Sequence, residues 1–217
     1  MEPTIIFEDG HLIVLNKPAG IVVEVDRFGY PSLERWVRDY FNTLRLPSNA
    51  ILGIVHRIDR PVSGVVVMAK KKSVLVSLNE QFATGRVVKT YRAVVEGVPE
   101  SKETTLNHFL QKDPLQKKAI IQPKKSKRAT AVSITYQPID PHAKGTLMEI
   151  HPHGGKYHQI RAQLGAAGLP IIGDSLYGAT KSFQENRIML HAYSITFIHP
   201  VSNTEVTYTA PIPGDWE

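Results

Sequence analysis

The stretch His56-Arg57-Ile58-Asp59-Arg60-Pro61-Val62-Ser63-Gly64 lies between two apolar runs, residues 51–55 and 65–69. It holds one carboxylate, Asp59, between two arginines, followed by a proline and a glycine that favour a turn. Polar groups crowded at such a break are typical of a strand end that faces a cleft. We therefore interpret Asp59 as a catalytic carboxylate. The alternative is a structural Arg–Asp ion pair at the turn.

The segments around this stretch predict a strand-rich fold. Residues 4–16 indicate two strands joined at an Asp9-Gly10 turn. Helices are expected over 32–41, with Ser32 as N-cap, over 73–82, with Ser73 as cap, and over 157–167, and residues 41–50 are expected to be loop. Strands often follow one another without a helix between them, which favours an α+β fold with a mixed, largely antiparallel sheet flanked by helices and loops around a central cleft. The remaining predicted strands are 64–69, 87–95, 105–110, 129–136, 145–150, 189–198 and 204–209.

Composition narrows the class of protein. A chain of 217 residues fits one large domain, and the lack of cysteine excludes disulfides, thiolate metal sites and cysteine catalysis. The N-terminus has no signal-peptide pattern and no apolar run approaches the roughly 20 residues that span a membrane, so we expect a soluble, cytoplasmic protein. A net charge of +6 favours an anionic partner such as nucleic acid.

The positive charge is concentrated in one segment. Between residues 104 and 139 the only acid is Asp113. The segment is either a solvated loop or hairpin face, or a surface that contacts phosphates. Its basic residues are Lys112, Lys117, Lys118, Lys124, Lys125, Lys127 and Arg128.

Other polar residues interrupt apolar segments elsewhere. Lys17, in a turn after the first strands, is either a cleft residue or a structural one. Tyr91, inside a predicted strand, is either a core aromatic or a ring that stacks on a base. His158 and Arg161 are three residues apart at a predicted helix start and would share a face. Arg161 is the better candidate to keep Asp59 ionised, because it could approach from another element.

Several site classes are absent from the sequence. The histidines, among them His151, His153, His158, His191 and His199, lack the H-E-x-x-H spacing of a zinc site, and we expect no metal. No glycine-rich dinucleotide or Walker motif occurs. A second carboxylate suited to glycoside hydrolysis is also missing.

Five segments, in order, resemble the RluA-type RNA pseudouridine synthases. The 56–64 stretch is similar to the family's H-R-L-D-x-x-T-S-G signature, with Ile58 and Val62 in place of Leu and Thr. Ahead of H-Q-I-R, the residues Gly154, Lys156 and Tyr157 replace the family's common Thr, Arg and Thr. The other matching segments are 8–20, with N-K-P-A-G, Lys89-Thr90-Tyr91-Arg92-Ala93, His158-Gln159-Ile160-Arg161 with the following Gly173-Asp174-x-x-Tyr177-Gly178, and Leu190-His191-Ala192.

The resemblance implies a role for each matching residue. Asp59 would be the catalytic nucleophile or base, Tyr91 would stack on the target base, and Arg161 would pair with Asp59. Arg57 would help to open the RNA and fill the vacated place. Arg60, Pro61 and Val62 keep structural roles. The other motif residues expected to bind substrate are His56, Lys89, His158, Gln159 and Leu190.

The resemblance also implies an enzyme without cofactor or metal that isomerises uridines in structured RNA, either ribosomal or transfer RNA, through base flipping. We expect residues 1–217 to form a single catalytic domain without an N-terminal S4-type RNA-binding domain, acting as a monomer. Two other functions stay open at this point. One is a non-catalytic RNA-binding or chaperone module on the same fold, and the other is a metal-dependent nuclease or phosphoesterase that uses the histidines.

Overall fold

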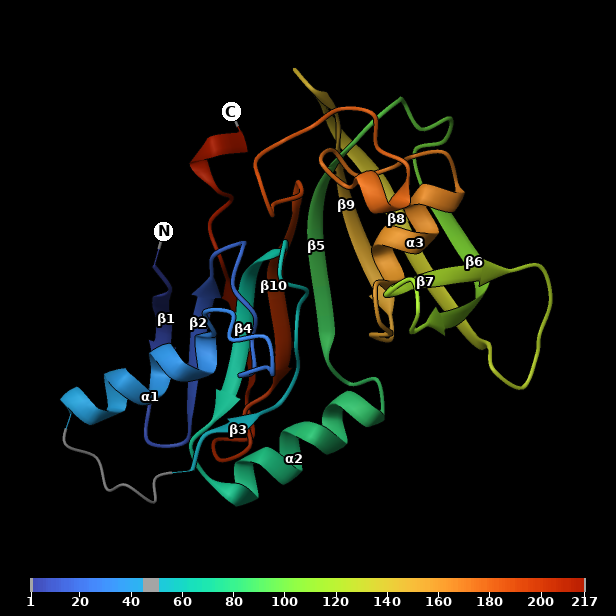
Figure 1. Ribbon diagram of the computed structural model, residues 1–217. Coiled ribbons are helices and arrows are strands. Elements are labelled where there is room, and N and C mark those ends of the chain that lie inside the picture. The colour runs from blue at the N-terminus through green and yellow to red at the C-terminus, as the bar shows by residue number, and fades with distance from the viewer. Residues whose placement is uncertain (1, 45–50, 217) are drawn as a thin grey trace. The chain divides into compact units, whose positions relative to one another are not determined.

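The computed structural model describes residues 2–44 and 51–216 (Figure 1). These residues form two compact units. Unit 1 comprises the described parts of Met1–Lys89 and Ala192–Gly214, and unit 2 those of Thr90–His191 and Asp215–Glu217. Strands dominate both units, which confirms the predicted α+β class. That residues 1–217 act as a single catalytic domain stays a prediction.

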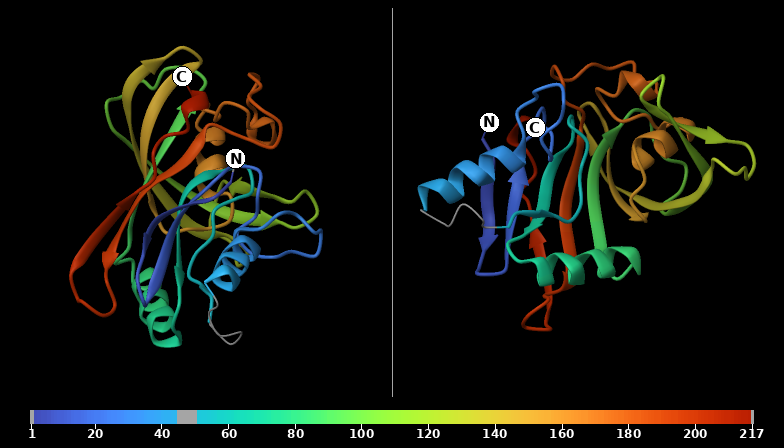
Figure 2. Two further views of the ribbon diagram at one scale, coloured as in Figure 1. Left: turned by 90° about the vertical axis from the view of Figure 1, so that its left-hand side faces the viewer. Right: turned by 60° about the horizontal axis from the view of Figure 1, so that its bottom comes forward.

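Unit 1 is built on antiparallel strands. β1 (Thr4–Glu8) and β2 (Leu12–Lys17) form the predicted hairpin, and the Asp9 carboxylate closes its turn by accepting from the backbone N–H groups of His11 and Leu12. β2 also pairs with β4 (Ser63–Ala69), against whose end lies the short β3 (Gly53–Ile54). The order continues through β10 (Leu190–Ile198), which begins in unit 2, to β11 (Glu205–Thr209), and Figure 2 shows these last two strands as a hairpin.

The core of unit 1 explains why β4 reads as a continuous apolar run. Every residue of β4 is buried, as are residues 12–15 of β2. Gly64 opens the strand with a φ of +120°, and a Cβ there would lie 2.2 Å from the carbonyl oxygen of Ala192. Only glycine allows this close approach of the two backbones, which fixes the place where the 56–64 stretch enters the sheet.

Two helices complete unit 1. α1 (Leu33–Thr43) begins as predicted, with the Ser32 hydroxyl accepting from the Arg35 N–H at 3.2 Å. Residues 45–50 of the predicted loop lie outside the described residues. α2 (Lys72–Ala83) lies beside β3 and β4, and its N-cap is Lys71, so the prediction of Ser73 as cap is wrong. Ser73 is already inside the first turn.

Unit 2 contains a second antiparallel series, in the order β5-β9-β8-β6-β7. β5 (Val88–Val95) starts in unit 1, and its partners are β9 (Gly145–His153), β8 (Thr130–His142), β6 (Thr104–Asp113) and β7 (Lys118–Gln122). β7 was not predicted as a strand, because it is short and its apolar residues follow two lysines; its Ala119 is buried and Ile121 packs against the same cluster.

Helix α3 (Gln159–Ala166) packs against β6, β7 and β8, as Figures 1 and 2 show. It begins two residues later than predicted. The 3₁₀ turns η1 (Ser175–Tyr177) and η2 (Gly214–Trp216) follow along the chain. None of the helices in the described part of the chain is both long and apolar enough to cross a membrane.

Candidate active site

Asp59 occupies a turn that leads directly into β4. The Val62 N–H donates to the Asp59 carbonyl at 3.0 Å, and the side chain of Asp59 is half-buried. The turn therefore presents the carboxylate just before the buried strand, at a break in the apolar core. This agrees with the interpretation drawn from the 56–64 stretch.

The Lys17 side chain is hydrogen-bonded to the backbone of this turn and of the N-K-P-A-G turn. Its Nζ donates to the carbonyl oxygens of Pro18 at 3.0 Å and Ile21 at 2.8 Å, with a longer contact of 3.4 Å to that of Arg60. The side chain is fully buried, and burial lowers the pKa of Lys17 to about 7, while the negative charge of Asp59 opposes that shift. Three acceptors match the three N–H donors of an ammonium group, so we assign the charged form to Lys17. These hydrogen bonds fit the structural interpretation of Lys17, while its charge also acts on Asp59.

The backbone of the same two segments is joined as well. The Gly20 N–H donates to the Arg60 carbonyl at 2.8 Å, so that oxygen accepts from both Gly20 and Lys17. The N-K-P-A-G turn and the Asp59 turn are thus cross-linked at one carbonyl, immediately next to Asp59. This fixes the backbone of Asp59 without using its carboxylate.

His56 fixes the start of the stretch. Its Nε2 accepts from the Val67 N–H at 3.1 Å, and its ring stacks on Phe82 with centroids 5.1 Å apart. Burial lowers the pKa of His56 to about 3, with a further contribution from the Lys89 cation, so the ring is neutral and free to accept at Nε2. Burial likewise lowers the pKa of Lys89. The substrate-binding roles predicted for these two residues stay predictions.

The two arginines of the stretch point to one neighbouring loop. Arg57 forms an exposed ion pair with Glu24, and the Arg60 guanidinium lies 4.2 Å from the ring centroid of Tyr30. An exposed ion pair contributes only about 0–1 kcal/mol, so another anion can replace Glu24 as the partner of Arg57 at little cost.

In unit 2, Arg161 forms a buried bidentate ion pair. Its Nε and Nη2 donate to the two carboxylate oxygens of Asp174 at 2.7 and 2.8 Å, and the side chains are 7% and 2% exposed. Asp174 was not predicted as the partner of Arg161, although its position in Gly173-Asp174-x-x-Tyr177-Gly178 was a usable signal. The predicted pairing of Arg161 with Asp59 joins residues of the two units and stays a prediction.

His158 and Arg161 meet on Tyr177 and not through a shared helical face. His158 precedes α3 with a left-handed φ of 52°, so the helical spacing does not apply to it. Its Nδ1 is 2.9 Å from the Tyr177 hydroxyl, which also accepts from the Ala119 N–H at 2.7 Å. The Arg161 guanidinium lies 5.1 Å from the Tyr177 ring centroid. Tyr177 thereby connects the start of α3 to β7.

The other predicted site residues of unit 2 have defined places. Gln159 is buried and bonded through both ends of its amide, to the Lys156 N–H and to the Ser133 carbonyl. Tyr91 is half-buried on β5, opposite Ile150 of β9, and Leu190 is buried at the start of β10. Their predicted roles toward substrate stay predictions.

The histidines are not gathered at one point. Among residues 2–44 and 51–216 there is no group of three or more His, Asp or Glu side chains that could hold a metal ion. His151 contacts Glu149 at 3.2 Å, and His153 bonds the Thr135 hydroxyl at 3.1 Å.

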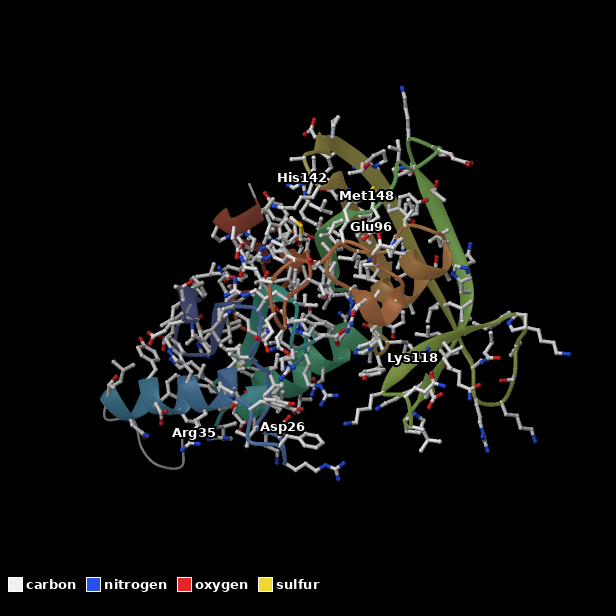
Figure 3. The ribbon with its side chains drawn as sticks, turned by 45° about the horizontal axis from the view of Figure 1, so that its top comes forward. Asp26, Arg35, Glu96, Lys118, His142 and Met148 are labelled. Atoms are coloured by element: carbon white, nitrogen blue, oxygen red, sulfur yellow. The ribbon has the colours of Figure 1, made fainter. Side chains whose placement is uncertain are left out.

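The basic segment forms the β6–β7 hairpin and the loop that follows it. Lys118 lies opposite Asp113 at the hairpin end, where Figure 3 shows nitrogen-tipped side chains projecting outward. Lys112 lies over the ring of Tyr157 at 4.7 Å, and the Tyr157 hydroxyl donates to the Lys117 carbonyl. The hairpin is therefore tied to the residues just before α3.

Known proteins with similar sequences and folds identify the family of this chain. A sequence model described as RNA pseudouridylate synthase matches residues 11–166. Ribosomal large subunit pseudouridine synthase C of Buchnera aphidicola is 35% identical over 98% of this chain and 68% of its own length. An uncharacterized RNA pseudouridine synthase of Zymomonas mobilis is 36% identical over 96% of this chain and 93% of its own.

The fold comparison agrees with the sequence comparison. The solved structure of human RNA pseudouridylate synthase domain containing 4 has a TM-score of 0.80 and 23% identity, covering 98% of this chain and 89% of that one. The family match extends over more than half of the chain and includes Lys17, Asp59, Tyr91 and Arg161. The chain belongs to the RluA-type RNA pseudouridine synthases, which are isomerases that act on RNA.

Proposed function

We propose that Asp59 is the catalytic carboxylate with which this enzyme converts uridine to pseudouridine. The observation that carries the proposal is the anchoring of its turn. The carbonyl next to Asp59 is held by both Lys17 and Gly20, and the buried Lys17 ammonium lies close enough to interact electrostatically with the carboxylate. A nearby cation favours the ionised form that a nucleophile or base requires.

The proposed reaction breaks the N1–C1′ bond of uridine, rotates the base, and joins C5 to C1′. The proton on C5 is then lost while N1 gains one, so atoms and charge balance without a cofactor or metal. Asp59 acts either as nucleophile or as base. The reacting carbon lies inside the RNA stack, so we include base flipping in the proposal.

Three arginine and tyrosine roles complete the proposal. Tyr91 stacks on the flipped base, and Arg161 supports the charge of Asp59. Arg57 exchanges its exposed Glu24 partner for the RNA and fills the place of the uridine. His56, Lys89, His158, Gln159 and Leu190 support substrate binding. We further propose that residues 1–217 act as one catalytic domain, as a monomer in the cytoplasm.

For the substrate, we propose structured RNA, with large-subunit ribosomal RNA as the first to test. Two of the similar relatives, ribosomal large subunit pseudouridine synthases C of Buchnera aphidicola and D of Zymomonas mobilis, are named for that RNA. Transfer RNA is the second substrate to test. Pseudouridine mapping of total RNA from cells with and without the gene distinguishes the two, because a lost site identifies both the RNA and the uridine.

The lysine-rich part of unit 2 is proposed to contact RNA phosphates. Replacing Lys124, Lys125 and Lys127 together by glutamine should weaken RNA binding and flatten the dependence of log K on log salt by about two, at roughly 0.7–0.9 per lost phosphate contact. An unchanged salt slope would return these exposed lysines to the solvated-face interpretation.

The decisive experiment replaces Asp59 by Asn and by Ala. Total RNA from cells lacking the gene is incubated with each purified variant, and pseudouridine is mapped. We expect wild-type folding and RNA binding with no product. The control is Asp39→Asn on the exposed side of α1, which should retain full activity. Product from a folded Asp59→Ala protein would end the proposal, and activity lost with EDTA would point to metal-dependent chemistry instead.

A further inference from the structure

A short loop of unit 1, residues 24–31, presents two exposed aromatic rings on a rigid turn. The Asp26 carboxylate accepts from the backbone N–H groups of Phe28 at 3.0 Å and Tyr30 at 3.3 Å. Gly29 completes the turn with a φ of +73°. Phe28 and Tyr30 are nonetheless 57% and 42% exposed. The backbone of the loop is thus ordered by its own hydrogen bonds, while its largest apolar side chains face water.

Cations flank both rings. The Arg27 guanidinium carbon lies 5.0 Å from the centroid of the Phe28 ring, and that of Arg60 lies 4.2 Å from the centroid of Tyr30. The two rings are themselves 6.1 Å apart at an interplanar angle of 44°. Exposed aromatic faces with guanidinium groups beside them are the arrangement with which proteins bind unpaired nucleotides, since bases stack on the rings and phosphates pair with the arginines.

The loop is tied to the Asp59 turn at three points. The Gly20 N–H, just before the loop, donates to the Arg60 carbonyl. Glu24 at its start pairs with Arg57, and Tyr30 at its end lies under Arg60. The segment therefore wraps along the residues on both sides of Asp59. A nucleotide next to one that reached Asp59 would be within reach of this loop.

Charge selects the kind of partner. Both acids of the loop already have partners. Asp26 accepts hydrogen bonds within its own turn, and Glu24 forms an exposed ion pair with Arg57 that another anion can replace. Arg27 lies beside the Phe28 ring and Arg60 beside the Tyr30 ring, which suits a polyanion that also carries flat bases. An acidic protein segment would satisfy the arginines but would leave the exposed rings of Phe28 and Tyr30 without a flat partner.

We propose that Phe28 and Tyr30, together with Arg27 and Arg60, form a stacking platform for an unpaired nucleobase that neighbours the reacting uridine in the RNA. This inference rests on the proposed role of Asp59. It assigns to Arg60 a role in substrate selection: the enzyme prefers uridines whose neighbour is unstacked or easily unstacked.

The test measures binding of two probes in the Asp59→Asn background, so that no reaction occurs. One is a fluorescein-labelled single-stranded ten-residue oligouridylate, and the other is the same strand annealed to oligoadenylate. Phe28→Ala should weaken binding of the single strand by about 5- to 150-fold, the range of one base–aromatic stack. Affinity for the duplex should stay within twofold, and the salt slope should not change, because no charge is lost. Val25→Ala, an exposed apolar residue of the same loop, is the matched control and should bind like the parent.

Two further variants separate stacking from charge and from misfolding. Phe28→Trp should retain binding, and its added fluorescence should be quenched by the single strand. Arg60→Gln keeps the backbone carbonyl that anchors the turn, so it should lower both the affinity and the salt slope, the latter by about 0.7. If Phe28→Ala lost the same affinity for single strand and duplex, the platform would be wrong. If it lost no affinity for either, the platform would also be wrong, and a protein partner would become the better explanation of the exposed rings.

Failure of the stacking platform can be told apart from failure of the catalytic role of Asp59. If Asp59→Asn still makes pseudouridine, the role of Asp59 fails while the binding result for Phe28 stands. If Asp59→Asn is inactive but Phe28→Ala binds both probes normally, the platform alone is wrong.

Discussion

The buried ion pair of Arg161 and Asp174 allows a quantitative test of how Arg161 is held in place. Both side chains are almost fully buried, and two hydrogen bonds of 2.7 and 2.8 Å join them. Removing one partner of such a pair leaves an uncompensated buried charge and costs about 3–5 kcal/mol. Asp174→Asn and Arg161→Met should therefore each lose about that much stability, which for a chain of this size lowers Tm by roughly 6–20 °C.

The double variant is the informative one. With both charges gone, no lone ion is left inside unit 2, so the double variant should lose much less than the sum of the single losses. We expect a coupling free energy of about 3 kcal/mol, measured by urea unfolding of the four proteins in one double-mutant cycle. The matched control is the exposed ion pair of Arg86 and Glu80, whose coupling should stay below about 1 kcal/mol.

Additive effects would refute the reasoning. Losses of Asp174→Asn and Arg161→Met that sum within about 0.5 kcal/mol to the loss in the double variant would show that the pair is not energetically coupled. Arg161 would then be held by other groups. A normal coupling with full catalytic activity in Asp174→Asn would show that the pair stabilises unit 2 without orienting Arg161 for the reaction.

Three further predictions concern unit 1. Burial lowers the pKa of folded His56 to about 3, below the ordinary 6.5, so its stabilising contribution is complete above pH 6.5 and is lost as the pH falls toward 3. Between pH 7.5 and 5 the wild type should therefore lose about 2 kcal/mol more unfolding free energy than His56→Gln, measured by urea unfolding. Equal losses in the two proteins would contradict a neutral, buried His56. Gly64→Ala places a Cβ 2.2 Å from the Ala192 carbonyl at a positive φ, so it should abolish soluble folded protein, whereas Gly10→Ala, with open space around it, should unfold like the wild type. Lys17→Met removes the ammonium group that donates to three carbonyl oxygens and should lower the free energy of unfolding by about 3 kcal/mol, measured by thermal unfolding. Pseudouridine formation should also fall at temperatures well below the new Tm. An unchanged rate would leave Lys17 a purely stabilising residue.

Local patterns in the sequence were enough for most of the elements. The β1–β2 hairpin, the cap of α1 at Ser32 and the fully buried β4 depend on neighbouring residues, and all three were predicted correctly. Ser73 failed as a cap because a capping preference is worth only about 1 kcal/mol, and the course of the chain out of β4 can outweigh it.

The contacts that define the site are of a different kind. Lys17 and Arg60 are 43 residues apart, and the hydrogen bond between them depends on the exact path of two loops. Arg161 and Asp174 are only 13 residues apart, but the chain between them leaves α3 and turns at Gly168 and Gly173, which both have positive φ. A sequence shows that both charges exist and cannot show which oxygen each nitrogen reaches.

Arg60 illustrates why a motif can conceal a role. In an extended chain the side chain of Arg60 would point away from Asp59, and for that reason Arg60 was predicted to have only a structural role. In the structure the Arg60 guanidinium lies over Tyr30, in the same loop as Phe28. The sequence of that loop has no helical or strand periodicity from which its position could be predicted. Under the proposed stacking platform, Arg60 would contact the nucleotide that neighbours the reacting one. Substrate choice in this chain is accordingly expected to depend on the 24–31 loop more than on the residues of the reacting centre.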